Sequence, residues 1–520
     1  MISMNTLFKS GILSGLILIF SVAMGFGDSE NHIKAVKQYR SAHEHEIIKE
    51  FVQLLSIPNV SSDQTNVRKN GEFIKEMMSK RGIDTRIMET AGNPVVFGEL
   101  KVPGAEQTLM FYVHYDGQPV DPAKWTGTHP FKPALRPGKL KAGTTEPKPI
   151  PFPGRRHKFD ENWRIYARSS SDDKAPIIAI LTALDALKHA GIAVKHNLKF
   201  IFEGEEEMGS PNLRPFLAKH KDIFKSDVLF MCDGPAYYSG DPTLFFGVRG
   251  ITTLEITVYG PNTSVHSGHY GNWAPNPAVR LAHLLASMRD TTGRVSIKGF
   301  YDTVVPLTET EIRALKAVPS FEEEIKKNYG FSRQETNWPS LLQSIQFPAL
   351  NINGMRSGWV GKQQRTIVPS TATAAVDIRL VKGNEPRDMV QKVMAHIREQ
   401  GYHVVDHDPE HEIRMSYPLI AKVIPAEDGY YAHRTPMDLP ICRQVISSLQ
   451  SVKDRTFVFL PSLGGSLPIH MFYATLDLPV IGVSIVNHDN NQHQQDENVR
   501  IGHLWNGIDT YAAILMMNTN

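Results

Sequence analysis

The stretch LKFIFEGEEE (residues 198–207) runs from an apolar segment into four carboxylates spread over five positions. The apolar segment has the length and composition of a buried strand. Carboxylates this close repel one another, and at least one of them resists ionisation unless a cation lies among them. The stretch therefore predicts a strand that ends either in a solvated acidic turn or beside a bound cation.

Two other segments repeat this layout. Residues 108–116 (TLMFYVHYD) and 228–233 (VLFMCD) are apolar runs, the first ending in histidine and aspartate and the second in aspartate. Segments at 44–55 and 67–81 have helical periodicity, and residues 176–189 are also expected to form a helix. Continuous apolar strands alternating with helices predict an α/β fold with a mostly parallel sheet flanked by helices. Because functional residues of such sheets gather beyond the carboxyl ends of the strands, we expect these side chains to lie together.

The pattern changes between residues 249 and 416. ITTLEITVYG (251–260) alternates as a half-exposed antiparallel strand does. The elements after it are a helix at 276–287, a strand at 371–380, a helix at 386–399 and a strand at 403–405. A β-α-β-β-α-β order of this kind predicts a ferredoxin-like α+β module, inserted into a larger domain made of residues 28–248 and 417–520.

Residues 130–158 interrupt the α/β pattern of the larger domain. They contain seven prolines, and most of their charged residues are lysine and arginine. This composition predicts a solvated loop or flap outside the core.

Length and composition narrow the class of protein. A chain of 520 residues predicts two or more domains, and 41% hydrophobic with 21% charged residues is ordinary for a folded protein. The formal net charge of +2 gives no broad basic field for nucleic acid. Two cysteines, Cys232 and Cys442, exclude a disulfide framework.

The first 27 residues have the layout of a secretory signal peptide. Lys9 precedes an apolar run at 12–26, and the small residues Ala23, Gly25 and Gly27 offer cleavage sites. The run is short for a stable membrane span, although an uncleaved anchor remains the alternative. We expect a secreted or periplasmic protein with no stable membrane span after signal removal.

Seven residues of ligand type follow strands or loops of the larger domain: His114, Asp116, Asp172, Glu206, Glu207, Asp233 and His493. Taken singly, each also fits an ordinary role; SSSDDK (169–174), for example, is typical of a helix N-cap with a first-turn acid, enough to explain Asp173. Together, two histidines and several carboxylates suit divalent metals, zinc foremost, with manganese or cobalt as alternatives. A paired-metal site polarises a carbonyl and generates hydroxide, and it needs a further carboxylate to carry the proton.

Six stretches follow one another along the chain in this order: HYDGQPVDPAKW, SSSDDKAP, EGEEEMGS, CDGP, VHSGHYG and NNQHQQDEN. They resemble the successive signatures of the co-catalytic zinc peptidases, the family of carnosinase-type dipeptidases, glutamate carboxypeptidase and aminoacylase. The resemblance covers essentially the whole mature chain.

This resemblance implies two metal ions. His114 and Asp233 would bind one, Glu207 and His493 the other, and Asp172 would bridge the two. The crowding of acids at 203–207 is then tolerable, because metal charge lies beside the last of them.

The resemblance also implies the catalytic carboxylates. Glu206 would be the general base and then the acid that protonates the leaving amine. Asp116 would support His114 from behind, fixing its tautomer and basicity.

The inserted module resembles the lid and dimerisation domain of the family, which implies a homodimer. His266 would reach the partner subunit's site and stabilise the oxyanion. Arg379 would capture a substrate carboxylate, a task that suits a guanidinium fork. Thr366 and Ser466 would make further substrate contacts.

Two departures from the family pattern leave the substrate preference open. Ala167-Arg168-Ser169 stands where the family usually has Gly-Arg-Gly, and Ala175 where glycine is common. Glycine allows backbone shapes that alanine and serine resist. The segment at 130–158 is also longer than usual.

The leading hypothesis is a metal-dependent peptidase acting on dipeptides or short peptides. One alternative is an N-acyl-amino-acid deacylase or carboxypeptidase on the same scaffold, because one catalytic centre cleaves either amide. The other is a non-catalytic binding relative, which the presence of Glu206 and every ligand disfavours.

Overall fold

The computed structural model describes residues 30–427 and 429–518. They form two compact units. The first comprises the described residues up to Phe245 together with Thr435–Leu460 and those from Met471 onward; the second comprises Phe246–Arg434 and Pro461–His470. The signal peptide predicted for residues 1–27 lies outside the described residues.

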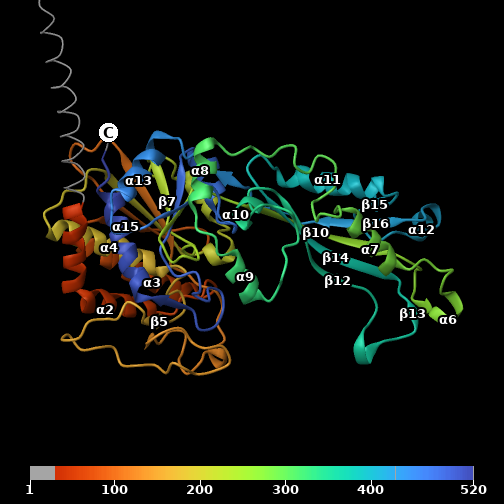
Figure 1. Cartoon of the computed structure of the whole chain (residues 1–520), viewed down its shortest axis with the longest axis horizontal. Helices are drawn as coiled ribbons and strands as arrows, with labels where there is room; N and C mark the ends of the chain where they lie inside the picture. Colours follow the sequence, from red (N-terminus) through yellow and green to blue (C-terminus); the bar gives the residue numbers. More distant parts are fainter. Residues whose placement is uncertain (1–29, 428, 519–520) are drawn as a thin grey trace, which may run out of the picture. The chain divides into compact units, whose positions relative to one another are not determined.

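The first unit is built on an eight-stranded sheet (Figure 1). Its four consecutive strands β6, β3, β7 and β19 are parallel, and antiparallel pairs occur at β1–β2, β2–β6 and β19–β8. The strand order is β1 (Asp84–Met88), β2 (Val95–Leu100), β6 (Asn197–Glu203), β3 (Thr108–His114), β7 (Val228–Met231), β19 (Val480–Ser484), β8 (Thr243–Phe245) and β18 (Val458–Leu460). The α/β fold and the three strands on which its prediction rested are confirmed.

Helices cover this sheet. The bounds are α2 (Glu44–Leu55), α3 (Gln64–Lys80), α4 (Lys174–His189), α5 (Leu213–Lys219), α13 (Pro440–Gln450), α14 (Ile469–Leu476) and α15 (Ile501–Leu515). Helices α4 and α15 contact each other, and nearly every residue of both is buried. Tyr511 of α15 meets Phe111 of β3 edge to face at 6.3 Å, so α15 packs directly on the central strands. Such all-round burial explains why both helices are apolar on every side.

Part of the proline-rich segment belongs to the folded core, which corrects the prediction of a solvated loop. Its strand β4 (Ala134–Arg136) pairs with β5 (Arg164–Tyr166), and β5 pairs with β20 (Asn498–Arg500). The Arg136 side chain is fully buried, lies over the Tyr166 ring at 5.4 Å and donates to the carbonyl of Thr145. Elsewhere the segment is largely exposed.

The second unit is an antiparallel sheet with one parallel edge pair. Its order is β12 (Ala349–Arg356), β14 (Thr371–Leu380), β10 (Gly250–Tyr259), β16 (Ile420–Pro425) and β15 (His403–Val405). Helices α7 (Pro277–Ser287) and α11 (Pro386–Glu399) share a buried core with it, including Leu284 and Val393. This is the predicted ferredoxin-like arrangement. It extends beyond the predicted end at residue 416, because β16 pairs with the central strand β10.

Short elements complete the second unit. They are β9 (Gly247–Val248), β11 (Val265–His266), α6 (Ser267–Tyr270), α8 (Glu309–Ala317), α9 (Glu322–Tyr329), α10 (Leu341–Ser344), β13 (Ile367–Val368), α12 (His411–Ser416) and β17 (His433–Arg434). Among the helices of residues 30–427 and 429–518, none is both long and apolar enough to cross a membrane.

Candidate metal centre

Three parallel neighbours bring the first ligand-type residues together. His114 is the last residue of β3 and pairs in register with Glu203, the last residue of β6. Asp233 follows the end of β7. Because β3 lies between β6 and β7, all three chains reach the same edge of the sheet, as the sequence predicted.

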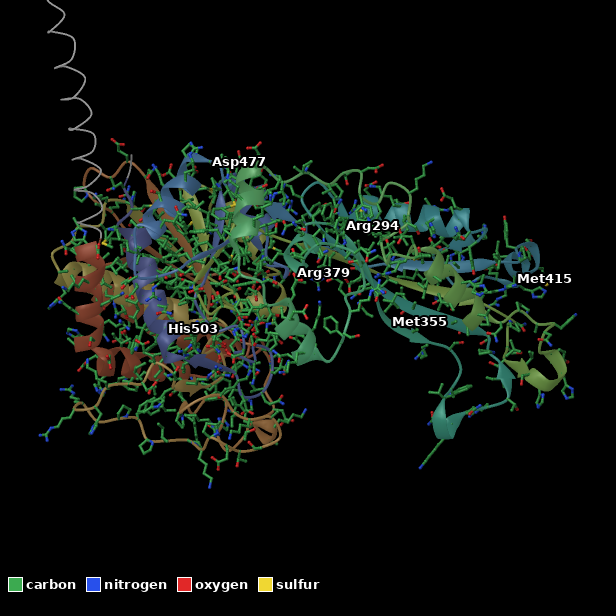
Figure 2. All side chains as sticks on the ribbon, viewed as in Figure 1. Arg294, Met355, Arg379, Met415, Asp477 and His503 are labelled. Carbon is green, nitrogen blue, oxygen red and sulfur yellow. The ribbon has the colours of Figure 1, made fainter. Side chains whose placement is uncertain are left out.

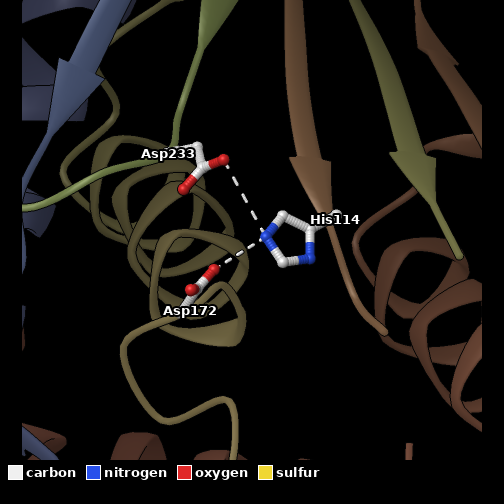
Figure 3. A group of neighbouring side chains, drawn as sticks. All are labelled: His114, Asp172 and Asp233. Atoms are coloured by element: carbon white, nitrogen blue, oxygen red, sulfur yellow. Dashed lines mark hydrogen bonds and ion pairs between the residues drawn. The ribbon is translucent and has the colours of Figure 1, made fainter. Parts of the chain in front are cut away.

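A first group consists of His114, Asp172 and Asp233 (Figure 3). The Nε2 atom of His114 lies 2.8 Å from Oδ1 of Asp172 and 3.9 Å from Oδ2 of Asp233. All three residues are buried. Asp172 comes from the segment immediately before α4, far from the two strands in sequence.

A second group consists of Asp172, Glu207 and His493. The Nε2 atom of His493 lies 3.1 Å from Oδ2 of Asp172 and 3.4 Å from Oε2 of Glu207. Asp172 therefore offers one carboxylate oxygen to each group, which is the geometry of a bridging ligand. His493 is the most exposed member, with 53% of its side chain accessible.

The charges of the cluster fit divalent cations. Burial raises the pKa of Glu207 to about 7 and that of Asp233 to about 6, and neighbouring carboxylates add to both shifts. For Asp172, burial acts in the same direction but is outweighed by the two histidines, which lower its pKa. The hydrogen bond to Asp172 raises the pKa of His493 to about 9. A buried surplus of carboxylates beside two imidazoles is a nitrogen-and-oxygen donor set that suits zinc, manganese or cobalt.

Glu206 lies beside the cluster but in neither group. Its Oε2 atom is 4.0 Å from Nε2 of His114, and 18% of its side chain is exposed. Burial raises its pKa well above the ordinary value, and the carboxylate of Asp233 adds to the shift. Glu206 is therefore a proton-accepting group at the rim of the cluster.

Asp116 is fully buried behind His114. Its Oδ1 atom lies 3.3 Å from Nδ1 of His114, and its carboxylate accepts the backbone N–H groups of Glu206 and Glu207 at 3.2 and 3.1 Å. Ser61 donates to the same carboxylate at 2.7 Å. One side chain therefore orients the imidazole and fixes the backbone of the adjacent glutamates.

The first two acids of EGEEE are stabilised by hydrogen bonds, so only part of the crowding at 203–207 is explained by a nearby metal. Glu203 accepts the Tyr112 hydroxyl at 2.5 Å. Glu205 accepts the backbone N–H of Asn93 at 2.8 Å and the amide of Asn212 at 2.9 Å. The sequence expectation for these two acids is corrected accordingly.

The residue next to the shared ligand does not act as a helix cap. Asp173 is at the N-cap position of α4, but its side chain makes no capping hydrogen bond and both its oxygens are buried without a partner. Burial raises its pKa well above the ordinary value. The simple capping explanation for SSSDDK is therefore wrong for this side chain.

The predicted catalytic residue His266 and the three predicted substrate-binding residues lie in the second unit and form two pairs. His266 ends β11, and the next residue, Ser267, donates its N–H to the carbonyl of Thr366 at 3.0 Å. Arg379 on β14 donates to the hydroxyl of Ser466 at 3.3 Å. Thr366 therefore lies near His266, and Ser466 near Arg379.

Two polar residues near the ligands were not singled out from the sequence. Gln118 donates to Oε2 of Glu207 at 2.7 Å, and Glu497 accepts the backbone N–H of Asp172 at 3.0 Å. Gln118 lies in HYDGQPVDPAKW and Glu497 in NNQHQQDEN, the stretches that contain His114 and His493. Their closeness in sequence to these predicted ligands is the signal that could have identified them.

The departure from Gly-Arg-Gly is accommodated locally. Ser169 has φ of +59°, in the left-handed region that favours glycine. Its hydroxyl accepts a hydrogen bond from Asn59 at 2.9 Å, which compensates in part for the unfavourable backbone.

Fold and centre define a class. A chain with ligand-type side chains at the carboxyl edge of an α/β sheet, one shared carboxylate and a separate acid has the layout of a two-metal hydrolase. The model of peptidase family M20/M25/M40 matches residues 110–517. The chain belongs to this peptidase family and is an enzyme of that class, which confirms the family resemblance.

Individual relatives cover nearly the full chain. Cys-Gly metallodipeptidase DUG1 of Candida albicans is 25% identical over 90% of this chain and 93% of its own. Human Beta-Ala-His dipeptidase is 25% identical over 81% of this chain and 77% of its own. The crystal structure of the M20 family metallo-carboxypeptidase Sso-CP2 from Sulfolobus solfataricus has a TM-score of 0.69 and 27% identity, covering 91% of this chain and 99% of that one.

Proposed function

We propose that the protein hydrolyses the peptide bond of dipeptides or short peptides with the help of two divalent cations, zinc foremost and manganese or cobalt as alternatives. One observation carries the proposal: Asp172 is shared by two ligand groups, and Glu206 lies beside them as a member of neither. The names of the relatives, a Cys-Gly metallodipeptidase and a Beta-Ala-His dipeptidase, support this substrate class.

Two bound cations would supply Lewis-acid polarisation of the scissile carbonyl and a water of lowered pKa. His114, Asp172 and Asp233 would hold one cation. Asp172, Glu207 and His493 would hold the other.

Glu206 would move the proton. Its carboxylate accepts a proton from the attacking water and then donates it to the leaving amine. Asp116 keeps Glu206 and His114 in place, because its carboxylate accepts the backbone N–H of Glu206 and also contacts Nδ1 of His114. A base with a raised pKa is suited to this exchange near neutral pH.

The second unit would complete the site across a homodimer. Nδ1 of His266 accepts the N–H of Gly268 at 3.0 Å, so in the neutral ring the proton is on Nε2 and the exposed side chain is a donor suited to an oxyanion. β12 is an edge strand of the sheet, and Ile352 and Met355 on it are 38% and 55% exposed (Figure 2 labels Met355). An edge strand with exposed apolar residues supports pairing with a second copy.

Recognition of a free carboxylate would come from Arg379. Its side chain is 35% exposed, and its Nε lies 3.6 Å from Oδ1 of Asp377. Ser466, which already accepts from Arg379, and Thr366 would add hydrogen bonds to the substrate. This arrangement supports substrates that end in a carboxylate, which dipeptides and carboxypeptidase substrates share.

A carboxypeptidase is the second candidate, because the metallo-carboxypeptidase Sso-CP2 is 27% identical over 91% of this chain. A panel assay separates the candidates. Zinc-loaded protein is given dipeptides, longer peptides and N-acetyl amino acids, with Glu206→Gln as the matched inactive control. We expect dipeptides to be cleaved fastest; fastest turnover of longer peptides favours the carboxypeptidase, turnover of acetyl amino acids alone favours the deacylase, and no turnover favours a binding relative.

The proposed location is outside the cytoplasm, by secretion or in the periplasm. The support is the layout of residues 1–27 in the sequence, with a basic residue, an apolar run and small residues. Expression of the full chain followed by mass determination of the mature N-terminus tests this proposal. A mature protein that retains Met1 would contradict it.

A further inference from the structure

One buried carboxylate joins the two segments that carry Asp172 and His493. Glu497 has no exposed surface. Its Oε1 atom accepts the backbone N–H groups of Ser171 and Asp172, both at 3.0 Å, and the Ser171 hydroxyl at 2.9 Å. The backbone of the shared ligand is therefore bound directly by a side chain from the loop of His493.

The second oxygen of Glu497 binds the same segment further upstream. Its Oε2 atom accepts the N–H of Ser169 at 2.9 Å and a guanidinium N–H of Arg168 at 2.7 Å. Arg168 also donates to the carbonyl of Gln494 at 3.1 Å, beside His493. Five donors thus bind one carboxylate. Arg168, which carries the opposite charge, is a second link between the two segments, because it also binds the carbonyl of Gln494.

The loop of His493 needs outside support. Asn491, His493 and Asp496 have φ of +57°, +63° and +59°, in the left-handed region, which is uncommon outside glycine even though asparagine, aspartate and histidine enter it more readily than other residues. Asp496 accepts the N–H and the hydroxyl of Thr126 at 2.9 and 2.7 Å. The backbone N–H of Asn498 is bound by a carbonyl within the same loop. Glu497, between these two anchors, is the contact that ties the loop to the shared ligand.

We propose that Glu497 is a positioning residue that holds Asp172 and His493 close enough for both to bind the same cation. Its own oxygens are saturated by five donors, so it acts through the ligands and not as one of them. Groups behind metal ligands orient them, and their removal typically lowers metal affinity about 10- to 100-fold. This inference rests on the proposed function, because it presumes that the two groups bind metal.

The test is a zinc titration of the Glu497→Gln protein against a competing chelator, at a temperature where the variant is folded. The amide keeps the shape of the carboxylate but turns an NH2 donor towards N–H donors. We expect zinc affinity to fall about 10- to 100-fold. Asp489→Asn is the matched control, because Asp489 accepts from both Nη atoms of Arg164 at 3.0 Å and, within residues 30–427 and 429–518, forms no hydrogen bond or ion pair with Asp172. It should lower the melting temperature while leaving zinc affinity near wild type.

A milder variant covers the case in which Glu497→Gln does not fold. Ser171→Ala removes one of the five donors and should lower zinc affinity by a smaller factor in the same direction. Wild-type zinc affinity in whichever of the two variants folds, or an equal loss in Asp489→Asn, overturns the positioning role. If the wild-type protein binds two zinc ions and these variants bind them equally well, only this inference is wrong. If the wild-type protein binds no divalent cation, the proposed function is wrong as well.

Discussion

The candidate metal centre and the residues of the second unit that we propose act on the substrate differ in how much of their surroundings one chain supplies. His114 and Asp116 are completely buried, and Asp116 alone contacts the imidazole, a serine and two backbone N–H groups. His266 is exposed, and Arg379 keeps a third of its side chain accessible.

This difference has a physical origin. A buried charge without a partner is very costly, so a ligand cluster must be built completely by the fold that encloses it. An exposed imidazole or guanidinium remains hydrated, so it costs little free energy to leave it without a protein partner until a substrate or a second subunit binds. Activity should therefore depend on metal content and pH through the ligand cluster. It should depend on the substrate's carboxylate and on subunit exchange through the residues of the second unit.

The largest expected effect is that of metal removal. Chelation should abolish activity, and zinc, manganese or cobalt should restore it, because both ligand groups offer only nitrogen and oxygen donors. Protons compete for the same ligands: with pKa values of about 6 for Asp233 and about 7 for Glu207 in the metal-free site, metal affinity should fall as pH falls below neutral. Elemental analysis beside activity, above and below neutral pH, checks both points. Full activity after verified metal removal contradicts the mechanism.

Replacing Glu206 by glutamine should lower kcat about 100- to 10,000-fold while metal content stays at the wild-type level. The physical reason is that the carboxylate moves the proton without belonging to either ligand group. Glu205→Gln is the control, because Glu205 is bound by Asn93 and should affect stability more than kcat. Loss of metal along with activity would instead make Glu206 a ligand.

His266→Ala should lower kcat about 100-fold or more, because one donor to a developing oxyanion is worth about 3 kcal/mol. His269, whose ring lies 4.8 Å away, is the matched control and should be replaceable by alanine at little cost. Mixing inactive Glu206→Ala and His266→Ala proteins under subunit exchange should restore activity, up to half of wild type per mixed dimer. Verified exchange without recovered activity places His266 outside the partner's site.

Arg379→Lys should raise KM on the order of tenfold for peptides with a free carboxylate, because lysine loses the two-pronged geometry of the guanidinium. Peptide amides should be affected much less. Arg294→Lys is the control within the same unit, where Figure 2 labels Arg294 and Arg379. The Arg294 guanidinium lies over the Trp338 ring at 4.9 Å. Equal effects on acids and amides would argue against carboxylate recognition.

The smallest expected effect is that of Cys232→Ser. Cys232 adjoins Asp233 in sequence, but it is buried in the core, its Sγ lies 3.5 Å from the carbonyl of Phe230, and it belongs to neither ligand group. Metal content and kcat should be unchanged, with a stability loss of about 1–3 kcal/mol from burying a hydroxyl. Loss of metal would add a sulfur ligand to the centre.

Local patterning was sufficient for the main elements. Strands β3, β6 and β7 are mostly apolar runs, α2 and α11 show helical periodicity, and α4 is a long apolar segment, so each was expected close to its observed bounds. Strand β4 was missed, because three residues among prolines are too few to show a period. Strand β16 was assigned to the larger domain instead of the second sheet, because its place depends on pairing with β10, which lies far away in the sequence.

The sequence by itself determined the fold class, the family and the set of residues able to bind metal, because these depend on residue type, spacing and order along the chain. Only the tertiary structure decided what each acid of EGEEE does: Glu203 is bound by a tyrosine and Glu205 by a backbone N–H, while Glu207 faces His493. It also decided that Glu497 holds Asp172. Hydrogen-bond partners and pKa values depend on neighbours in space, and these neighbours come from segments far apart in the chain.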